Sequence, residues 1–398
     1  REGVRSFDKA LSIEKNFATV YFHKGIALAN LGRHEDAILA FNKNIDFDSG
    51  NSEAFYHKGL SLVATGRQKD AIDAFDRVLQ INPSSVESWL HRGMALADLN
   101  KFNDALEAYV KTLEIDPDNA DTWFCKGTAL FSLFSFDDAI EAFCKALEIR
   151  PDFAQAYYYK GRSLYELGMD KEALLSYDNA LAIEPKNIEA FYHKGLALSR
   201  LHRFDDAIVS FDQALRLRPT AAFIWTGKGI AQSSLGQDQE AIRSYLKALS
   251  IDIKDARAYY YLGVSFSRVG RYNDAIKNFD AAIAQRPKCT KAFYQKGRAL
   301  ASLSMYHEAL NAFNRALNES GTFSDIWLYK GISEANLGEY HTALDSYDKA
   351  ISMDATYALP HLYRGIALIH LNRHSEALNA FDQALTLQPE FPEALYYR

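Results

Sequence analysis

Few residues of this chain combine a reactive type with a spacing suited to chemistry. The histidines stand out first, because His23, His57, His91 and His193 are separated by multiples of 34 residues. If each lies on its own helix, packing holds neighbouring helix axes roughly 8–10 Å apart, so three consecutive histidines cannot converge on one ion. We therefore expect no metal site, and we interpret these imidazoles as partner-facing or hydrogen-bonded side chains.

Other catalytic signatures are missing from the sequence. Gly227-Lys228-Gly229 lacks the third glycine and the preceding strand of a dinucleotide fold, and no phosphate loop, nucleophile elbow or HExxH motif occurs. Cys125, Cys144 and Cys289 lack metal-ligand spacing and are too few for a disulfide framework, which favours a reducing cytoplasmic location. We expect a protein that is not an enzyme and that needs no cofactor.

A strict repeat organises the elements that position these residues. A glycine recurs every 34 residues, at Gly25, Gly59, Gly93, Gly127, Gly161, Gly195, Gly229, Gly263, Gly297, Gly331 and Gly365. An alanine follows each glycine twelve residues later, from Ala37 to Ala377, and an aromatic residue follows four residues after that, from Phe41 to Phe381. A fixed period of this length predicts a solenoid built from one small unit.

Each unit of 34 residues has the pattern of two antiparallel helices. We number positions 1 to 34 in units that begin at Ala18, Ser52, Val86, Ala120, Ala154, Ile188, Ala222, Ala256, Thr290, Ser324 and Ala358. Apolar residues at positions 4, 8 and 11 share one helical face, and positions 20, 21, 24, 27 and 28 form the stripe of a second helix. Glycine at position 15 suits the turn, and proline at position 32 ends the second helix. The pattern predicts about 23 helices, a short C-terminal stub and no strand.

Together, the period, glycine, alanine, aromatic residue and proline resemble the tetratricopeptide repeat (TPR) family over the whole chain. The resemblance implies an all-α fold, a right-handed superhelical α-solenoid of antiparallel helix pairs. Residues 1–17 resemble the second helix of a preceding repeat, residues 18–391 form eleven repeats, and residues 392–398 begin a twelfth. Neither end resembles a polar capping helix, so we expect a piece of a longer protein with end-to-end self-association through its apolar ends.

Position 7 departs from the family, in which leucine is usual. It is basic in ten repeats and apolar only at Leu262. In one interpretation the aliphatic stem packs while the charged end reaches water. In the other, these cations form a row of ion pairs with acids of the second helices. We favour the first, because position 7 lies at the edge of the contact between helices.

The resemblance also implies a binding surface. The first helices of such repeats line a concave groove, with positions 2, 5, 6, 9, 12 and 13 facing inward. Here these positions are rich in tyrosine and arginine, which dominate binding hot spots, although aromatic residues at position 5 also pack against the next repeat. The predicted peptide-binding residues are Tyr158, Arg162, Tyr192, Arg200, Thr226, Gly227, Arg257, Tyr260, Arg268, Tyr294 and Arg298. The family's carboxylate clamp and asparagine ladder do not match the residues at positions 5, 6 and 9.

The seventh repeat carries the predicted centre of this surface. Its inward positions hold no long polar side chain, so Tyr192 and Tyr260 would form the walls of a notch edged by Arg200, Arg257 and Arg268. The alternative is that Gly229 is the packing glycine of the repeat and that Gly227 has no role in binding.

The predicted partner is therefore a protein or peptide segment. The central arginines favour an acidic or mixed segment, while residues 1–153, with 17 basic and 24 acidic side chains, favour a basic one. The alternative is a recruiting arm of an enzyme whose catalytic domain lies outside this chain. RNA binding through tyrosine and arginine is a weaker hypothesis, because no concentrated basic surface is present, and we expect no nucleic-acid partner. No apolar run is long enough to span a membrane.

Overall fold

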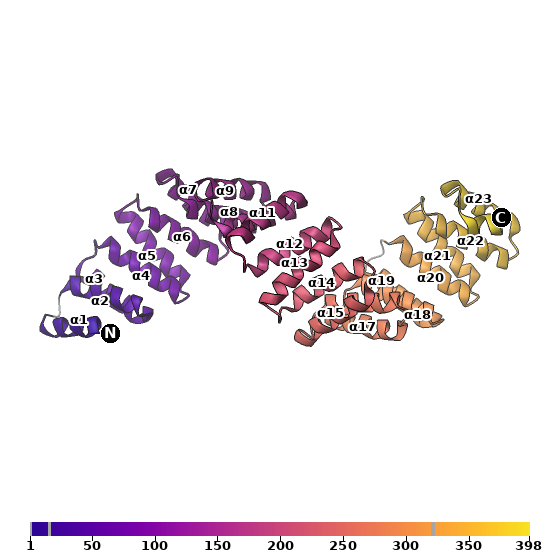
Figure 1. The fold of residues 1–398 in the computed structure, drawn as a ribbon, viewed down its shortest axis with the longest axis horizontal. Helices are drawn as coiled ribbons and strands as arrows, with labels where there is room; N and C mark the ends of the chain where they lie inside the picture. Colours follow the sequence, from indigo (N-terminus) through magenta and orange to yellow (C-terminus); the bar gives the residue numbers. More distant parts are fainter. Residues whose placement is uncertain (1, 15–16, 320–322) are drawn as a thin grey trace. The chain divides into compact units, whose positions relative to one another are not determined.

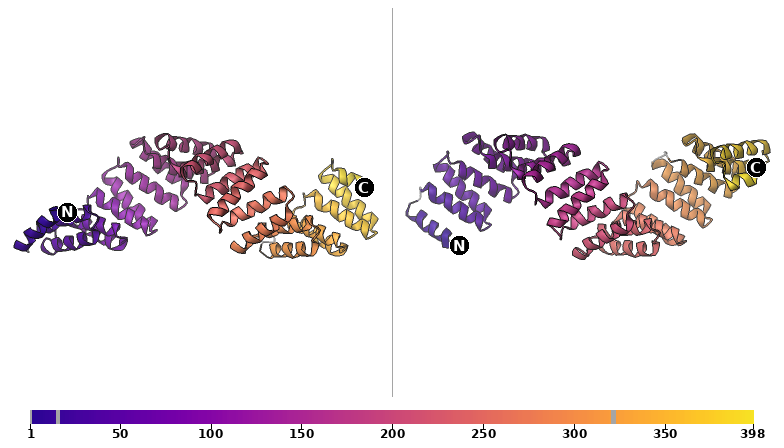
Figure 2. Two further views of the ribbon diagram at one scale, coloured as in Figure 1. Left: turned by 60° about the horizontal axis from the view of Figure 1, so that its bottom comes forward. Right: turned by 45° about the horizontal axis from the view of Figure 1, so that its top comes forward.

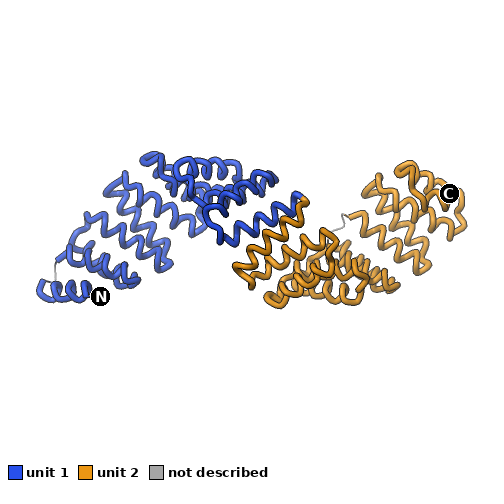
Figure 3. Tube along the Cα trace, in the orientation of Figure 1, with its two compact units in different colours: residues 1–201 blue, residues 202–398 orange. Residues whose placement is uncertain are grey.

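A computed structural model describes residues 2–14, 17–319 and 323–398 of the chain. Within these ranges the protein forms 24 α-helices and no β-strand, which confirms the all-α prediction. The helices fall into two compact units, residues 1–201 and 202–398, and each unit is described by itself (Figure 3). The division follows Leu201, so the sixth repeat gives one helix to each unit. One continuous body of eleven repeats therefore stays a prediction.

Unit 1 contains α1 and five helix pairs, followed by α12 (Figure 1). Its helices are α1 (Glu2–Ile13), α2 (Ala18–Asn30), α3 (His34–Phe47), α4 (Ser52–Ala64), α5 (Gln68–Ile81), α6 (Val86–Asp98), α7 (Phe102–Ile115), α8 (Ala120–Ser132), α9 (Phe136–Ile149), α10 (Ala154–Glu166), α11 (Asp170–Ile183) and α12 (Ile188–Arg200). Each even-numbered helix from α2 to α10 packs against the helix that follows it, and successive pairs pack against one another.

Unit 2 begins with α13 and continues with five helix pairs and the stub α24 (Figure 2). Its helices are α13 (Phe204–Leu217), α14 (Ala222–Ser234), α15 (Asp238–Ile251), α16 (Ala256–Arg268), α17 (Tyr272–Gln285), α18 (Thr290–Ser302), α19 (Tyr306–Glu319), α20 (Ser324–Asn336), α21 (Tyr340–Met353), α22 (Ala358–His370), α23 (His374–Leu387) and α24 (Pro392–Tyr397). No helix among the described residues of either unit combines the length and apolar character needed to cross a bilayer.

The glycine at position 8 allows the two helices of a repeat to approach closely. A Cβ added to Gly59 would lie 2.5 Å from Cε1 of Phe75, and one added to Gly263 would lie 2.6 Å from Cε1 of Phe279. Both rings are completely buried. The glycine series and the aromatic series sixteen residues later are thus two halves of one packing contact.

The turn within each repeat places position 15 in the left-handed backbone region. Six turns use glycine there, while Asn100, Phe134, His202, Ser304 and Asn372 adopt the same conformation with φ between 57° and 61°. A bulky side chain is disfavoured in this region. Phe134 is therefore the most strained of these turns, and its ring is 80% exposed.

The row of cations at position 7 forms ion pairs between repeats. Seven of them contact an aspartate at position 25 of the preceding second helix: Lys24–Asp8, Arg92–Asp76, Lys194–Asp178, Lys228–Asp212, Lys296–Asp280, Arg364–Asp348 and Arg398–Asp382, at 2.5–2.8 Å. Our preference for charged ends that reach only water was wrong. In the one repeat with an apolar position 7, Leu262, the preceding position 25 is Leu246. A basic position 7 does not require an acid there, since Lys126 follows Val110 and Lys160 follows Cys144.

Candidate functional site

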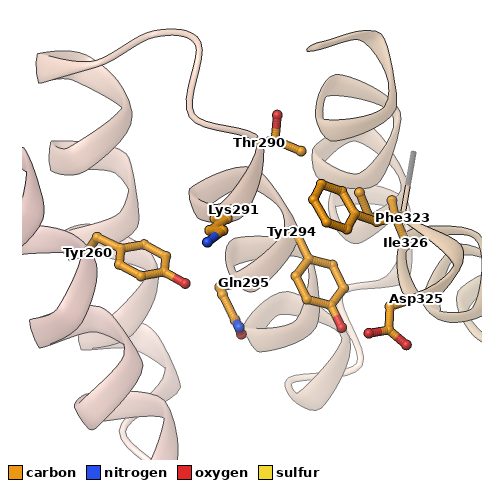
Figure 4. A pocket seen from close by; sticks show the side chains of 8 residues that line it. All are labelled: Tyr260, Thr290, Lys291, Tyr294, Gln295, Phe323, Asp325 and Ile326. Atoms are coloured by element: carbon orange, nitrogen blue, oxygen red, sulfur yellow. The ribbon is translucent and has the colours of Figure 1, made fainter. Parts of the chain in front are cut away.

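A pocket among the predicted inward positions lies in unit 2, where the first helices α16, α18 and α20 lie side by side. Figure 4 shows Tyr260 of α16 on one side and Phe323, Asp325 and Ile326 around the start of α20 on the other. The side chains between them, Thr290, Lys291, Tyr294 and Gln295, come from the first two turns of α18. The cavity has a volume of about 230 Å³, which is enough for one side chain of a bound segment.

Aromatic and hydrogen-bonding groups share this pocket. Burial raises the pKa of the Tyr260 hydroxyl. Burial raises the pKa of Tyr294 as well, so both tyrosines stay neutral donors near pH 7. Asp325, on the far side, accepts a hydrogen bond from the Tyr357 hydroxyl at 2.8 Å. The pocket therefore combines rigid aromatic walls with hydroxyl and amide groups.

Arg298 extends the pocket along α18. Its guanidinium lies 5.6 Å from the ring centre of Tyr294 and 4.7 Å from that of Tyr329. The sequence-predicted residues Tyr260, Tyr294 and Arg298 are thus brought together in unit 2. Arg257 belongs to the same row of first helices and is exposed at the start of α16.

Unit 1 repeats part of this arrangement. Arg162 lies 4.8 Å from the ring centre of Phe131. Burial raises the pKa of Tyr158 to about 12. The Tyr158 ring also meets His193 edge-on at 5.7 Å. Tyr158 and Arg162 therefore pack within the repeat array, and their role in binding a partner stays a prediction.

Arg200 and Arg268 share a contact that sequence reasoning missed. In unit 1, Arg200 donates to the Tyr165 carbonyl at 2.8 Å and to the Asp170 carboxylate at 3.0 Å. In unit 2, Arg268 donates to the Ser233 carbonyl at 2.8 Å and lies 3.7 Å from Asp238. Each arginine occupies position 13 and contacts positions 12 and 17 of the preceding repeat. Both residues link adjacent repeats, whatever they contribute to a partner.

The predicted notch of the seventh repeat stays a prediction, because Tyr192 belongs to unit 1 and Tyr260 to unit 2. Within unit 2, Thr226 and Gly227 are buried. The Thr226 hydroxyl donates to the Asp255 carboxylate at 2.9 Å, and Asp255 also caps the N-terminus of α16. Thr226 therefore helps to join α14 to α16, which sequence reasoning had not anticipated.

The histidines at position 6 contribute to packing between repeats. His57 stacks on Phe41 with ring centres 6.1 Å apart, and His193 stacks on Tyr177 at 6.3 Å. Burial lowers the pKa of His193 to about 4, and its Nδ1 atom is buried without a hydrogen-bond partner among the described residues. His91 is hydrogen-bonded to the Glu87 carbonyl at 2.8 Å, as the hydrogen-bonded interpretation predicts. Over the described ranges, no group of histidine, cysteine and acidic side chains is placed to hold a metal ion.

The sequence analysis also missed the second wall of the unit 2 pocket. Phe323 directly precedes α20, at a position where α4, α6, α8, α12 and α16 begin with a capping Asn, Ser or Asp. The same position is also aromatic at Phe17, Phe153, Tyr357 and Phe391, so the residue type alone did not distinguish Phe323. Together with Asp325 and Ile326, it closes the side of the pocket opposite Tyr260.

Comparisons with known proteins agree with this architecture. Family models described as tetratricopeptide repeat or TPR repeat match residues 18–51, 53–153, 161–220 and 233–391. A comparison with curated proteins returned no match.

Three similar solved structures illustrate the likeness. The APC/C hetero-tetramer Cut9-Hcn1 is 17% identical over 99% of this chain and 91% of that one, with a TM-score of 0.50. YrrB, described as a TPR protein with an unusual peptide-binding site, is 25% identical over 48% of this chain and 98% of its own, with a TM-score of 0.42. Yeast Tom70 is 15% identical over 96% of this chain and 94% of its own, with a TM-score of 0.43. On the family matches across its repeats, this chain belongs to the tetratricopeptide repeat family.

Proposed function

We propose that this protein is a non-enzymatic scaffold that binds an extended acidic segment of a partner protein along α16, α18 and α20. The single observation that carries the proposal is the pocket between Tyr260, Tyr294 and Phe323, beside which basic side chains gather. Its aromatic walls fit one apolar or aromatic side chain of the segment, since Tyr provides a large contact area with little loss of conformational freedom.

The charges around the pocket support an acidic partner. Arg257, Lys291 and Arg298 are exposed, and in the described part of the chain no carboxylate forms an ion pair with any of them. The one acid that lines the pocket is Asp325, which is hydrogen-bonded to Tyr357. Unpaired cations around an apolar pocket attract an acidic segment and disfavour a basic one.

A binding assay with paired peptides tests the proposal. The probes are two labelled twelve-residue peptides with one central phenylalanine, one rich in Glu and Asp and the other with every acid replaced by Lys. Fluorescence anisotropy with the full chain should detect the acidic peptide and not the basic one. Lys291→Glu should weaken this binding by roughly tenfold, since it reverses a charge at the pocket.

The matched control is Lys277→Glu, which makes the same charge change on the exposed face of α17, outside the pocket. It should leave the affinity within about twofold of the parent, because exposed charges more than a Debye length of about 10 Å apart are largely screened at 0.1 M salt. Equal loss in the two variants, or equal binding of both peptides, would contradict the proposal. Displacement of the acidic peptide by homopolymeric RNA would instead support a general anion-binding surface.

A further inference from the structure

A second cavity of unit 2 lies between α20 and α22 and is separate from the pocket of Figure 4. It has a volume of about 290 Å³, and Asn336, Tyr340, Tyr347, Tyr363 and His370 are among the residues that line it. Tyr347 is completely buried, and its hydroxyl has no hydrogen-bond partner among the described residues. The equivalent hydroxyls of Tyr177 and Tyr245 also lack a partner in the described part of the chain, so this feature is shared with the repeat pairs that contain Arg200 and Arg268.

The repeat itself indicates what this cavity resembles. At the equivalent place in two other repeat pairs the space is occupied by the guanidinium of Arg200 or Arg268, at position 13 of the second repeat. In the tenth and eleventh repeats position 13 is His370, and the aspartate at position 17 is replaced by Tyr340. These two rings stack at 4.5 Å with an angle of 6° between their planes. The stacked pair therefore stands where the sixth and eighth repeats have an arginine paired with the aspartate of the preceding repeat.

The groups around the cavity suit a cation. The Ala335 carbonyl accepts a hydrogen bond from the Gly338 amide at 3.0 Å, and the equivalent Tyr165 carbonyl accepts one from the Gly168 amide at 3.0 Å. The Tyr165 carbonyl also accepts a second hydrogen bond, from the Arg200 guanidinium. Ala335 lies in the last turn of α20, where the helix dipole places partial negative charge. Asn336 donates from Nδ2 to the Ile332 carbonyl at 2.8 Å, which leaves its Oδ1 as an acceptor.

Aromatic faces add to this preference. Arg200 lies 4.0 Å from the ring centre of Tyr165 in the equivalent place, so a guanidinium is compatible with the ring-rich surroundings of this site. Neither lysine, arginine, aspartate nor glutamate lines the cavity between α20 and α22. A partner guanidinium therefore meets carbonyl oxygens, hydroxyls and aromatic faces without a competing ammonium.

We propose that the cavity between α20 and α22 binds the guanidinium of an arginine side chain presented by a partner protein. The donor groups of that arginine take the place that Arg200 and Arg268 fill from within the chain at the other repeat pairs. The planar guanidinium reaches the Ala335 carbonyl and the Asn336 oxygen.

The test uses the full chain and small probes observed by NMR line broadening. The probes are Nα-acetyl-arginine amide, its neutral citrulline counterpart and Nα-acetyl-lysine amide. The arginine probe should bind with a dissociation constant on the order of 1 mM, as expected for a ligand of about 15 non-hydrogen atoms. The citrulline and lysine probes should bind at least fivefold more weakly, because one lacks the charge and the other lacks the planar array of donors. Equal binding of citrulline or lysine would overturn the assignment to a guanidinium.

Two variants locate the site. The double variant Tyr340→Asp/His370→Arg rebuilds the Asp–Arg pair of the fifth and sixth repeats and should abolish binding of the arginine probe. His341→Arg makes a matched change at an exposed neighbour and should leave binding unchanged. Arginine binding that survives the double variant would overturn the proposal.

This inference is independent of the acidic-segment site. Lys291→Glu should weaken binding of the acidic peptide without changing the affinity for the arginine probe, since Lys291 does not line the cavity between α20 and α22. Loss of both activities in that variant would contradict the existence of two separate sites.

Discussion

The ion pair between Lys228 of α14 and Asp212 of α13 allows a direct test of how adjacent repeats are held together. The Lys228 ammonium lies 2.6 Å from the Asp212 carboxylate, and the two side chains are 16% and 40% exposed. At the equivalent positions of the next repeat the chain has two leucines, Leu246 and Leu262. We therefore consider three variants: Asp212→Leu, Lys228→Leu and the two together.

The expected magnitudes follow from the exposure of the pair. Fully exposed pairs contribute about 0.2–1 kcal/mol, whereas removing one partner of a fully buried pair costs about 3–5 kcal/mol. Lys228 is the more buried partner, and Asp212→Leu leaves its ammonium without a counter-charge. This variant should therefore lower the free energy of unfolding by about 1–2 kcal/mol. Lys228→Leu leaves the more exposed carboxylate and should cost less than about 1 kcal/mol. The double variant should lie within about 1 kcal/mol of the parent, because an apolar pair replaces both charges.

Hydrogen exchange measured by mass spectrometry on the full chain reads this effect locally. In a repeat array each unit contacts only its neighbours, so the change should be concentrated in peptides from α13 and α14. Asp212→Leu should speed their exchange by about 5–30-fold, and the double variant should restore it. If the double variant exchanges as fast as the sum of the single effects predicts, the two residues are not coupled and the reasoning fails.

Three further variants test other parts of the repeat. Gly263→Ala should lower the melting temperature despite a gain in helix propensity of about 1 kcal/mol, because its Cβ would lie 2.6 Å from Phe279; unchanged stability would disprove the close contact. Phe134→Gly should raise the free energy of unfolding by about 1 kcal/mol in urea titration, since glycine tolerates φ of 61°, and a loss of stability would mean that the ring is needed. The pKa of His193 is about 4 in the folded protein, below its unfolded value of 6.5. The parent should therefore lose up to about 3 kcal/mol of unfolding free energy as the pH falls from 6.5 to 4, and His193→Phe should remove this part of the pH dependence. Parallel stability–pH curves for the parent and this variant would refute that assignment.

The helices could be predicted from the sequence because each depends on contacts inside one repeat. Gly263 and Phe279 are sixteen residues apart, and a glycine and an aromatic residue recur at this spacing in all eleven repeats. In ten of them the structure shows the same close contact. The turn at Phe134 adopts the same backbone as the glycine turns, because the helices on either side fix its ends. Local periodicity therefore determined the secondary structure, even where one residue opposes it.

The candidate site was predicted only in part, because its geometry depends on contacts between repeats. Tyr260, Tyr294 and Arg298 were chosen by position and do lie together. Phe323 was missed because it stands outside the predicted inward positions, at the start of α20. The aromatic residues at position 6 were expected to face a partner or form hydrogen bonds, whereas rings such as His193 stack on the preceding repeat.

The contacts between repeats nevertheless leave a trace in the sequence when neighbouring copies are compared. Arginine occupies position 13 only at Arg200 and Arg268, and the preceding position 17 is then aspartate, Asp170 or Asp238. Where that position is Tyr340, position 13 is a histidine that stacks on it. Such pairwise variation distinguishes a residue that joins repeats from one that is available to a partner. For this reason we place the acidic-segment test at Lys291. Replacement of Arg200 or Arg268 would remove contacts between repeats, so a loss of binding could not be separated from a loss of stability.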